Sequence, residues 1–441
     1  MNHMRKNLAL LSLLLAAAGP AATQELLLTN AQIVDPARSQ VHNGSLLIVD
    51  GHIVGSPTAI PEGFAGETLD LGGMWVMPGL VDLHTHSYGN MAPGNQMDPP
   101  GTAIVAKRML YAGVTAFLDL FGDEETMYAL RSKLRAGEVE GAELFASLSC
   151  LTATEGHCTE YGVPTRTMDT PDEARRTVAD LAVREPDVVK IVYAQTGTMP
   201  SIDKPTLVAA VAAATGRGIR TVVHVNTWQD VRDAVAAGAS AVTHVPASEE
   251  VPPDLARDMA VRGVASIPTL AVETDFLDFV TDESVLANPL ATALTTTAII
   301  DAYRSDDVRA HVAEDVKARR RRTRTILSSV KTMADVGVTI LAGTDAGNWG
   351  TIQGYSLHRE LVKLVAAGLS SWDALAAATT RAGAFLGRSF GVSAGDEANL
   401  VVLDASPIDD IRNTQRIVMI IQRGRVVNRD RLLAPAPGDS R

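Results

Sequence analysis

The chain has 441 residues, and its 51 acidic side chains outnumber 39 basic ones, which gives a formal net charge of −12 at pH 7. That charge argues against nucleic acid as the main partner, and a hydrophobic content of 46% excludes a largely disordered chain. Two cysteines are too few for a disulfide-stapled scaffold.

Residues 1–24 are expected to form a cleaved signal peptide. Arg5 and Lys6 precede the apolar stretch from Leu8 to Ala18, and small residues follow it. The apolar stretch is too short to span a bilayer comfortably. We therefore expect a secreted or periplasmic protein without stable membrane insertion, the alternative being a cytosolic protein with an apolar N-terminus.

Residues 25–78 have the texture of short β strands. The apolar runs "ELLLTNAQIVD", "GSLLIVDGHIVG" and "GETLDLGGMWVM" are broken by Gly, Asn and Asp, as hairpins require. The same texture returns in "ANLVVLDAS" and "RIVMIIQRGRVVN". We expect residues 25–78 and 389–441 to combine in one small β-sandwich module built from both chain ends.

Residues 79–388 alternate apolar strands with alanine-rich helices. This alternation predicts an α/β domain folded as a (β/α)8 TIM-type barrel. A doubly wound open sheet is the alternative, and it is disfavoured because no glycine-rich phosphate fingerprint follows the first strand. The predicted strands are "GLVDLHTH", "VTAFLDL", "ELFASLSC", "DVVKIVYA", "IRTVVHV", "AVTHV", "ASIPTLAV" and "VTILAGTDA".

The connection between the seventh and eighth predicted strands, residues 273–337, is longer than a normal βα link. Its helical period predicts a helical insertion near the mouth of the barrel. The insertion contains the basic run "KARRRRTR" at 317–324. We interpret this run as a solvated helix face rather than an anionic docking patch.

The stretch "WVMPGLVDLHTHSYGN" ends a buried strand with two histidines, His84 and His86. Alternate side chains of a strand share one face, so the two imidazoles lie about 7 Å apart and can converge on one metal ion. His224, His244 and Asp345 also fall at the ends of predicted strands. In a (β/α)8 barrel the carboxyl ends of the strands carry the chemistry, so these side chains predict a metal site.

Lys190 lies inside the apolar strand "VVKIVYA". Burial should lower the pKa of its amine and favour the neutral form. A neutral amine can react with CO2 to give a carbamate, an anion able to bridge two metal ions. The alternative is a lysine that pairs with a buried aspartate.

The HxH pair, the lysine in the fourth strand, the two single histidines and the late "GTDA" resemble the amidohydrolase superfamily over nearly the whole mature chain. "TEGHCTEYG" and "HRELVKLVAAGLSSWDALAAATTRAGAFLG" are similar to its imidazolonepropionase-like branch, which includes Xaa-Pro and Xaa-Arg dipeptidases and ochratoxinase-type amide hydrolases. Typical imidazolonepropionases lack the bridging lysine, so Lys190 favours the two-metal hydrolases.

The resemblance implies a role for each ligand. His84, His86 and Asp345 would bind the more buried of two divalent metal ions, and His224 and His244 the more exposed one. Carboxylated Lys190, its carbamate derived from CO2, would bridge the two ions. This mixture of nitrogen and oxygen ligands favours zinc.

The same resemblance implies a binuclear hydrolase that cleaves an amide bond in a small molecule by attack of a metal-bridging hydroxide. Asp345 would carry the proton to the leaving amine. Dipeptides, N-acyl amino acids and amide-linked aromatic toxins are the expected substrates. The alternatives are a mononuclear deaminase or cyclic-imine hydrolase, a lactone or ester hydrolase, and a non-catalytic scaffold. The sequence leaves open whether the chain forms a homo-oligomer.

Two further residues are candidates for binding substrate. His157 follows the third predicted strand in a glycine-containing loop, and a loop-capping role is its alternative. Tyr193 lies three residues after Lys190, although strand alternation would turn it away. In an exported chain Cys150 and Cys158 could form a disulfide, with two free buried thiols as the equal alternative.

Overall fold

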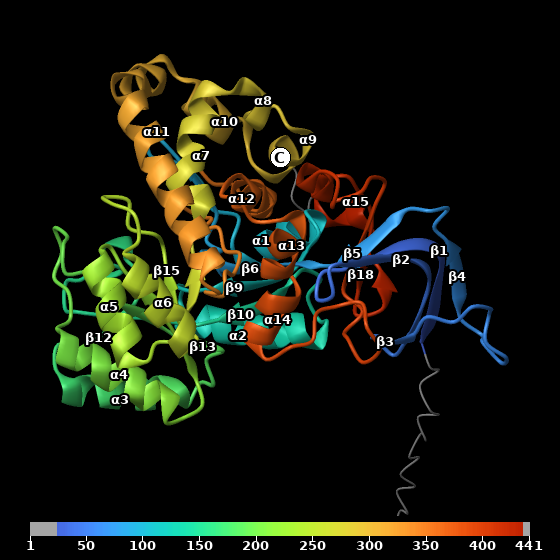
Figure 1. Ribbon diagram of the computed structural model, residues 1–441, viewed down its shortest axis with the longest axis horizontal. Coiled ribbons are helices and arrows are strands. Elements are labelled where there is room, and N and C mark those ends of the chain that lie inside the picture. The colour runs from blue at the N-terminus through green and yellow to red at the C-terminus, as the bar shows by residue number, and fades with distance from the viewer. Residues whose placement is uncertain (1–23, 435–441) are drawn as a thin grey trace, which may run out of the picture.

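The computed structural model describes residues 24–434. The expected signal peptide, residues 1–24, lies outside the described residues except for Gln24. Figure 1 shows strands from both chain ends on one side, alternating strands and helices in the middle, and the helices of residues 270–335 above them. Of the helices in residues 24–434, none combines the length and the apolarity that crossing a bilayer would require.

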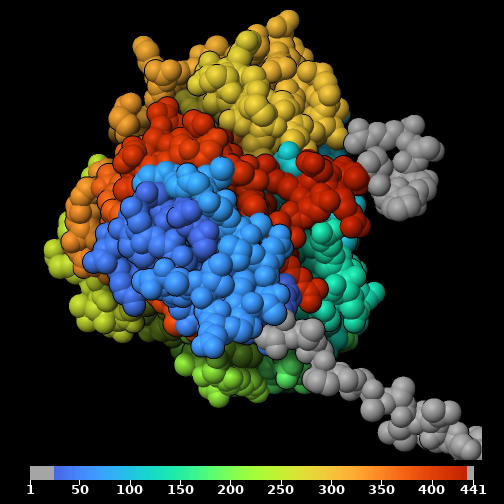
Figure 2. Space-filling view, turned by 90° about the vertical axis from the view of Figure 1, so that its right-hand side faces the viewer, coloured from blue at the N-terminus to red at the C-terminus, as the bar shows by residue number. Residues whose placement is uncertain are grey.

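The two ends of the chain meet in one eight-stranded sheet. Antiparallel pairing of β5 with β17 places Val76 opposite Val402, and β1 runs parallel beside β5. The pairings define a single connected sheet and do not by themselves divide it into the two layers of a sandwich. Figure 2 shows the blue segment from the N-terminal end and the red segment from the C-terminal end side by side on one face. The strands are β1 (Glu25–Asp35), β2 (Gln40–Val49), β3 (His52–Gly55), β4 (Glu67–Asp70), β5 (Trp75–Pro78), β17 (Leu400–Leu403), β18 (Ile417–Gln422) and β19 (Arg425–Val426).

The middle of the chain contains parallel strands that pair in chain order. One sheet has the order β10-β9-β6, and a second runs from β13 through β14 and β15 to β16. The N–H of Asp187 donates to the carbonyl of Ala146 at 3.0 Å and links the two sheets. These strands are β6 (Leu80–Thr85), β9 (Val114–Asp119), β10 (Glu143–Ala146), β13 (Val188–Val192), β14 (Arg220–His224), β15 (Ala241–Thr243) and β16 (Ala265–Ile267). Beyond β13 the second sheet continues with β11 (Cys150–Thr152) and then β12 (Arg166–Thr167), and β7 (Asn90–Ala92) and β8 (Gln96–Asp98) form a separate small hairpin.

Three of the predicted strands are shorter or less regular than expected. "ELFASLSC" is divided into β10 and β11, because Leu148 adopts a left-handed φ of 67°. "ASIPTLAV" ends as a strand at Ile267, since Pro268 cannot donate a ladder hydrogen bond and Thr269 has a φ of 51°. "VTILAGTDA" forms isolated bridges instead of a regular strand.

The irregular eighth segment nevertheless lies between the last and the first parallel strands. The N–H of Leu341 donates to Ser266 on one side at 2.9 Å, and the N–H of Leu83 donates to Ala342 on the other at 3.0 Å. A Cβ at Gly343 would come within 2.9 Å of the β6 backbone, so this approach requires glycine. The series of backbone pairings that starts at β6 therefore also ends at β6.

Helices follow the parallel strands, and their starts are marked in the sequence. Thr170 and Thr227 each form a capping box with the acidic residue three positions later, which satisfies N–H groups at the first turns of α3 and α5. These helices are α1 (Thr102–Tyr111), α2 (Glu124–Ala136), α3 (Pro171–Ala182), α4 (Lys204–Thr215), α5 (Trp228–Ala237), α6 (Pro253–Arg262), α12 (Tyr355–Ala366), α13 (Ser371–Ala377), α14 (Thr380–Leu386) and the short α15 (Arg429–Leu432).

The predicted helical insertion is present and is anchored by buried charges. Arg359 of α12 donates two hydrogen bonds of 2.9 Å to Asp275 of α7, whose side chain is fully buried. Breaking one partner of such a buried pair typically costs about 3–5 kcal/mol. The insertion comprises α7 (Leu270–Thr281), α8 (Glu283–Leu286), α9 (Pro289–Leu294), α10 (Thr297–Arg304) and α11 (Asp306–Asp335), the last kinked at Asp315.

Candidate metal centre

Three predicted metal ligands converge at the carboxyl end of β6. Nε2 of His84 lies 3.2 Å from Oδ1 of Asp345, and Nε2 of His86 lies 2.9 Å from the same oxygen. The N–H of Asp345 donates to the carbonyl of His84 at 2.7 Å, which holds the aspartate beside β6. The alternation of β6 and the return of the eighth segment together produce this cluster.

The two single histidines join the cluster from neighbouring strands. His224 is the last residue of β14, and His244 follows β15 directly. Their ring centroids lie 4.5 Å apart, and the His244 ring lies 5.2 Å from that of His84. His244 and Asp345 adopt left-handed φ values of 73° and 57°. Such backbone costs about 1–3 kcal/mol for a residue other than glycine and is concentrated at functional sites.

Hydroxyl groups orient two of the imidazoles. Nδ1 of His84 lies 2.6 Å from Oγ1 of Thr243, and Nδ1 of His244 lies 2.8 Å from Oγ1 of Thr269. When each hydroxyl accepts from the Nδ1–H, the lone pair of Nε2 faces the centre of the cluster. This is the arrangement in which histidine binds a metal ion.

The cluster fits a divalent cation better than it fits a set of hydrogen bonds. Among the described residues Oδ1 of Asp345 is buried without a hydrogen-bond partner, although two imidazole nitrogens approach it. Ligand atoms of His84, His244 and Asp345 all lie within 4.8 Å of one another. Imidazole nitrogens around a carboxylate oxygen suit zinc and related ions.

Burial also sets the protonation states that metal binding requires. It lowers the pKa of His84 and His224 well below the ordinary value and that of His244 to about 3, so the imidazoles are neutral at pH 7. Burial raises the pKa of Asp345, but the adjacent His84 and His86 more than offset this and hold it well below its usual range. Asp345 is therefore a carboxylate.

Lys190 is the buried amine of the centre. Its side chain comes from the middle of β13, with only 4% of the residue exposed. Burial lowers the pKa of Lys190 to about 7, with Asp345 acting in the opposite direction. A large fraction of the amine is consequently neutral near pH 7, the form that reacts with CO2. Lys190 forms no ion pair within residues 24–434, so the alternative of a lysine paired with a buried aspartate finds no support there.

All six predicted ligands line one cavity of about 1250 Å³. The cavity opens between the strand ends and the helical insertion, so a small molecule can reach the cluster. Its volume is above the range of about 300–1,000 Å³ usual for ligand pockets.

The match to known proteins extends over most of the chain. Residues 75–427 match the sequence model described as the amidohydrolase family. The chain belongs to the amidohydrolase family. Membership makes it an enzyme of a hydrolase family that acts on C–N bonds, and the family is typically metal-dependent.

Solved structures similar to this amidohydrolase cover nearly all of it. A Xaa-Pro dipeptidase with methionine bound in its active site has a TM-score of 0.72 and 20% identity, covering 92% of this chain and 100% of that one. Ochratoxinase from A. niger has a TM-score of 0.70 and 19% identity, covering 92% and 95%. At these identities the likeness concerns the fold alone.

Curated relatives match shorter stretches. A 5-methylthioadenosine/S-adenosylhomocysteine deaminase from Lawsonia intracellularis is 32% identical over 141 residues, which is 26% of this chain and 32% of that protein. Imidazolonepropionase from Pseudomonas paraeruginosa is 44% identical over 46 residues, 10% of this chain and 11% of that protein. The amidohydrolase thus matches about a third or less of the length of these relatives.

The two predicted substrate contacts lie in different places. His157 lines the cavity, with its ring centroid 5.0 Å from that of His224 and its Nδ1 2.6 Å from Oε1 of Glu160. Tyr193 is not among the cavity residues, and its hydroxyl donates to Oδ2 of Asp233 at 2.8 Å. Strand alternation turns it away from the site, so the prediction that Tyr193 contacts substrate is corrected.

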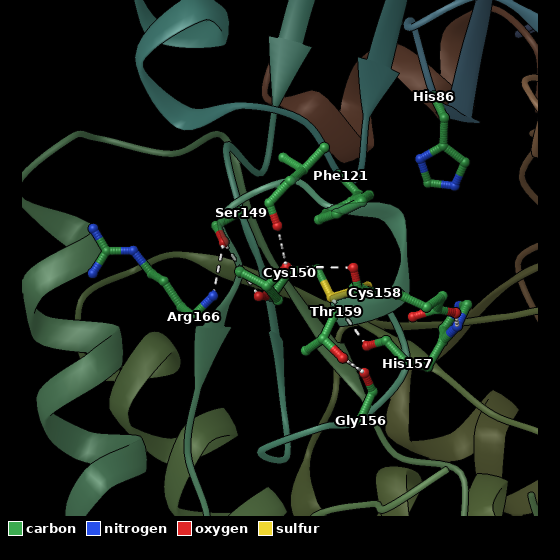
Figure 3. Close-up of a disulfide and its surroundings, with 12 residues drawn as sticks. His86, Phe121, Ser149, Cys150, Gly156, His157, Cys158, Thr159 and Arg166 are labelled. Atoms are coloured by element: carbon green, nitrogen blue, oxygen red, sulfur yellow. Dashed lines mark hydrogen bonds and ion pairs between the residues drawn. A yellow bond between two sulfur atoms is a disulfide. The ribbon is translucent and has the colours of Figure 1, made fainter. Parts of the chain in front are cut away.

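The two cysteines are joined in a disulfide at the base of the loop that carries His157. Figure 3 shows the disulfide, with His157 adjacent to Cys158. Cys150 pairs in register with Lys190, and Cys158 lines the cavity. Of the two alternatives left open by the sequence, the structure contains the disulfide.

Sequence reasoning missed several residues in the amidohydrolase cavity and directly behind its ligands. Thr243 and Thr269 orient imidazoles, but a threonine next to a strand end carries no distinctive signal. The insertion contributes Glu273 and two arginines of the basic run, Arg319 and Arg322. The run itself was the available signal, and only its packing separates the side chains that face the cavity from the rest.

Proposed function

We propose that this amidohydrolase is a binuclear metal-dependent enzyme that hydrolyses an amide bond in a small molecule, such as a dipeptide, an N-acyl amino acid or an amide-linked aromatic compound. One observation carries the proposal. Lys190, an unpaired buried amine among the described residues, lies in the same cavity wall as the histidines and aspartate that could hold a metal ion. Burial of an amine without a partner costs free energy, so we expect a reaction or a ligand that offsets this cost.

In the proposed enzyme the domain is a (β/α)8 barrel. The backbone pairings that lead from β6 through the other parallel strands to the eighth segment, and from there back to β6, support this fold. His84, His86 and Asp345 would hold one divalent ion, and His224 and His244 would hold the second. Carboxylated Lys190 would add an anionic oxygen ligand to the centre, and zinc suits the donor set. When bound, the two ions supply Lewis acidity and lower the pKa of a coordinated water to about 7.

The protein's own groups perform the remaining steps. Asp345 is a carboxylate in contact with the centre, so it accepts a proton from the attacking water at its oxygen and passes it to the nitrogen of the leaving amine. His157 lines the cavity beside His224, with its Nδ1 against the Glu160 carboxylate, and is placed to contact bound substrate. The helical insertion contributes Glu273, Arg319 and Arg322 to the cavity wall.

A mononuclear deaminase is the second candidate, favoured by the partial matches to the deaminases. That reaction requires one ion and no carbamate, so it leaves Lys190 without a role. A lactone or ester hydrolase would use the same centre as an amidase and differs only in substrate. Export of the chain, which residues 1–24 led us to expect, stays part of the proposal.

Elemental analysis of protein purified without chelators distinguishes these functions. We expect close to two metal ions per chain, and close to one would favour the deaminase. His224→Asn should lower the count, whereas the matched control His311→Asn, on the exposed side of α11, should not. Release of amino acids from a panel of N-acyl amino acids and Xaa-Pro, Xaa-Arg and Xaa-Lys dipeptides then tests the reaction. Two bound metals without release from any member would contradict amide hydrolysis of these substrates.

A further inference from the structure

Helix α11 divides the basic run at 317–324 between two environments. Arg319 and Arg322 line the cavity, with 30% and 54% of their side chains exposed. Arg320, Arg321 and Arg324 are exposed and are absent from the cavity wall. Residues three apart on a helix are neighbours on one face, so Arg319 and Arg322 present their guanidinium groups together.

Neighbouring side chains hold the Arg319 guanidinium in place. Its Nε donates to Oδ1 of Asp315 at 2.7 Å, and its Cζ lies 5.2 Å from the ring centroid of Phe276. The Phe276 ring stacks against Trp349, with centroids 6.5 Å apart and ring planes 20° apart. Trp349 itself lines the cavity with 46% of its surface exposed. An apolar surface therefore adjoins a fixed cation.

Arg322 is held differently, by a carboxylate that is itself largely buried. Its Nη2 donates to Oε2 of Glu273 at 2.6 Å, and the Glu273 side chain is 17% exposed. A guanidinium has five N–H donors. Within the described residues the two guanidinium groups make no hydrogen bonds other than those to Asp315 and Glu273, so donors of both remain free for a ligand. The two acidic partners fix the arginines and offset part of their charge.

We propose that Arg319 and Arg322 bind a free carboxylate of the substrate, so that the enzyme takes amides whose amine half bears that carboxylate. This inference rests on the proposed function. In a dipeptide or an N-acyl amino acid the carboxylate belongs to the amine half, and the scissile carbonyl would face the metal centre in the same cavity. Guanidinium groups match carboxylates in a two-point geometry. The adjoining Trp349 receives the apolar side chain of the same half.

The test uses N-acetyl-L-phenylalanine and its C-terminal amide, which differ only in the free carboxylate. We expect the wild-type enzyme to prefer the acid. Arg322→Gln and Arg319→Gln should each reduce that preference about tenfold, because KM for the acid rises while kcat is retained. Arg321→Gln, an exposed neighbour on the same helix, is the matched control and should keep the full preference. Equilibrium binding of both compounds to metal-free protein by calorimetry measures the same preference without turnover.

The outcomes separate this inference from the proposed function. Absence of hydrolysis in every variant would contradict the amidase, while the binding preference would still decide the role of the arginines. The inference is overturned if the wild-type protein shows no preference for the acid, or if Arg322→Gln and Arg319→Gln keep it. It is also overturned if His157→Gln abolishes the preference and both arginine variants do not, since the carboxylate would then bind at His157.

Discussion

Nδ1 of His84 lies 2.6 Å from the hydroxyl oxygen of Thr243, and this contact leaves the Nε2 lone pair of His84 facing Asp345. The pair links the end of β15 to the end of β6. Thr243 therefore acts as a positioning residue, since it touches a proposed ligand rather than the metal.

We expect Thr243→Val to weaken metal binding by about 10–100-fold, because the valine keeps the shape but cannot fix the tautomer of His84. Thr243→Ser retains the hydroxyl and should bind metal nearly as the wild type does. Competition with a chelator of known affinity measures both. Equal affinity of the valine and serine variants would show that the hydroxyl does not orient the ring.

Asp345→Asn should reduce kcat by about 10²–10⁴-fold, because the amide cannot accept the proton that the carboxylate carries. The change conserves size, so the fold should persist, as circular dichroism will show. Activity is to be compared at equal metal content, since Asp345 is also a proposed ligand. A variant with near-wild-type kcat and full metal content would eliminate Asp345 as the proton carrier.

Metal uptake should depend on bicarbonate and on pH through Lys190. Its pKa of about 7 means that the ammonium form dominates below pH 6 and the neutral amine above pH 8. Reconstitution of metal-free protein with zinc should therefore be fast at pH 8 with bicarbonate and slow at pH 6. Lys190→Met should bind less metal at either pH and show no response to bicarbonate. If that variant still responded to bicarbonate, bicarbonate would act at a group other than Lys190.

The lowered pKa of Lys190 also predicts a stability trend. Between pH 7 and the ordinary lysine value of about 10.4, the unfolded chain holds the proton that the folded, metal-free chain has lost. The free energy of unfolding should therefore rise with pH across this window in the wild type relative to Lys190→Met. Denaturant titrations at pH 7 and pH 9 give the free energy of unfolding of both proteins. A difference between wild type and Lys190→Met that is the same at both pH values would show that the amine has an ordinary pKa.

The disulfide should matter to substrate binding as well as to stability. Replacing Cys150 and Cys158 by alanine should cost about 2 kcal/mol of unfolding free energy, because it releases a short loop in the unfolded chain. It should also raise KM, since the loop carries His157 into the cavity. His157→Gln in the oxidised protein is the reference. A double alanine variant with unchanged KM would mean that the loop holds His157 without the bond.

Local patterns in the sequence determined the positions of the candidate ligands. His84 and His86 share a face because side chains alternate along a strand, and His224, His244 and Asp345 were placed by the ends of apolar runs. Lys190 was distinguished by its apolar neighbours alone. Each of these inferences depends on contacts within a few residues, where strand periodicity dominates. The pairing of the two chain ends also followed from their shared β texture.

Tertiary packing decided the features that depend on distant residues. The eighth segment pairs through isolated bridges and approaches the β6 backbone at Gly343, and no local propensity encodes that approach. Tyr193 is drawn to Asp233, and Arg319 and Arg322 are separated from the other arginines of their run only by how α11 lies over the cavity. Periodicity shows which side chains share a face of a helix or strand. Only the packed chain decides what each face meets, because burial and hydrogen bonding there join residues far apart in sequence.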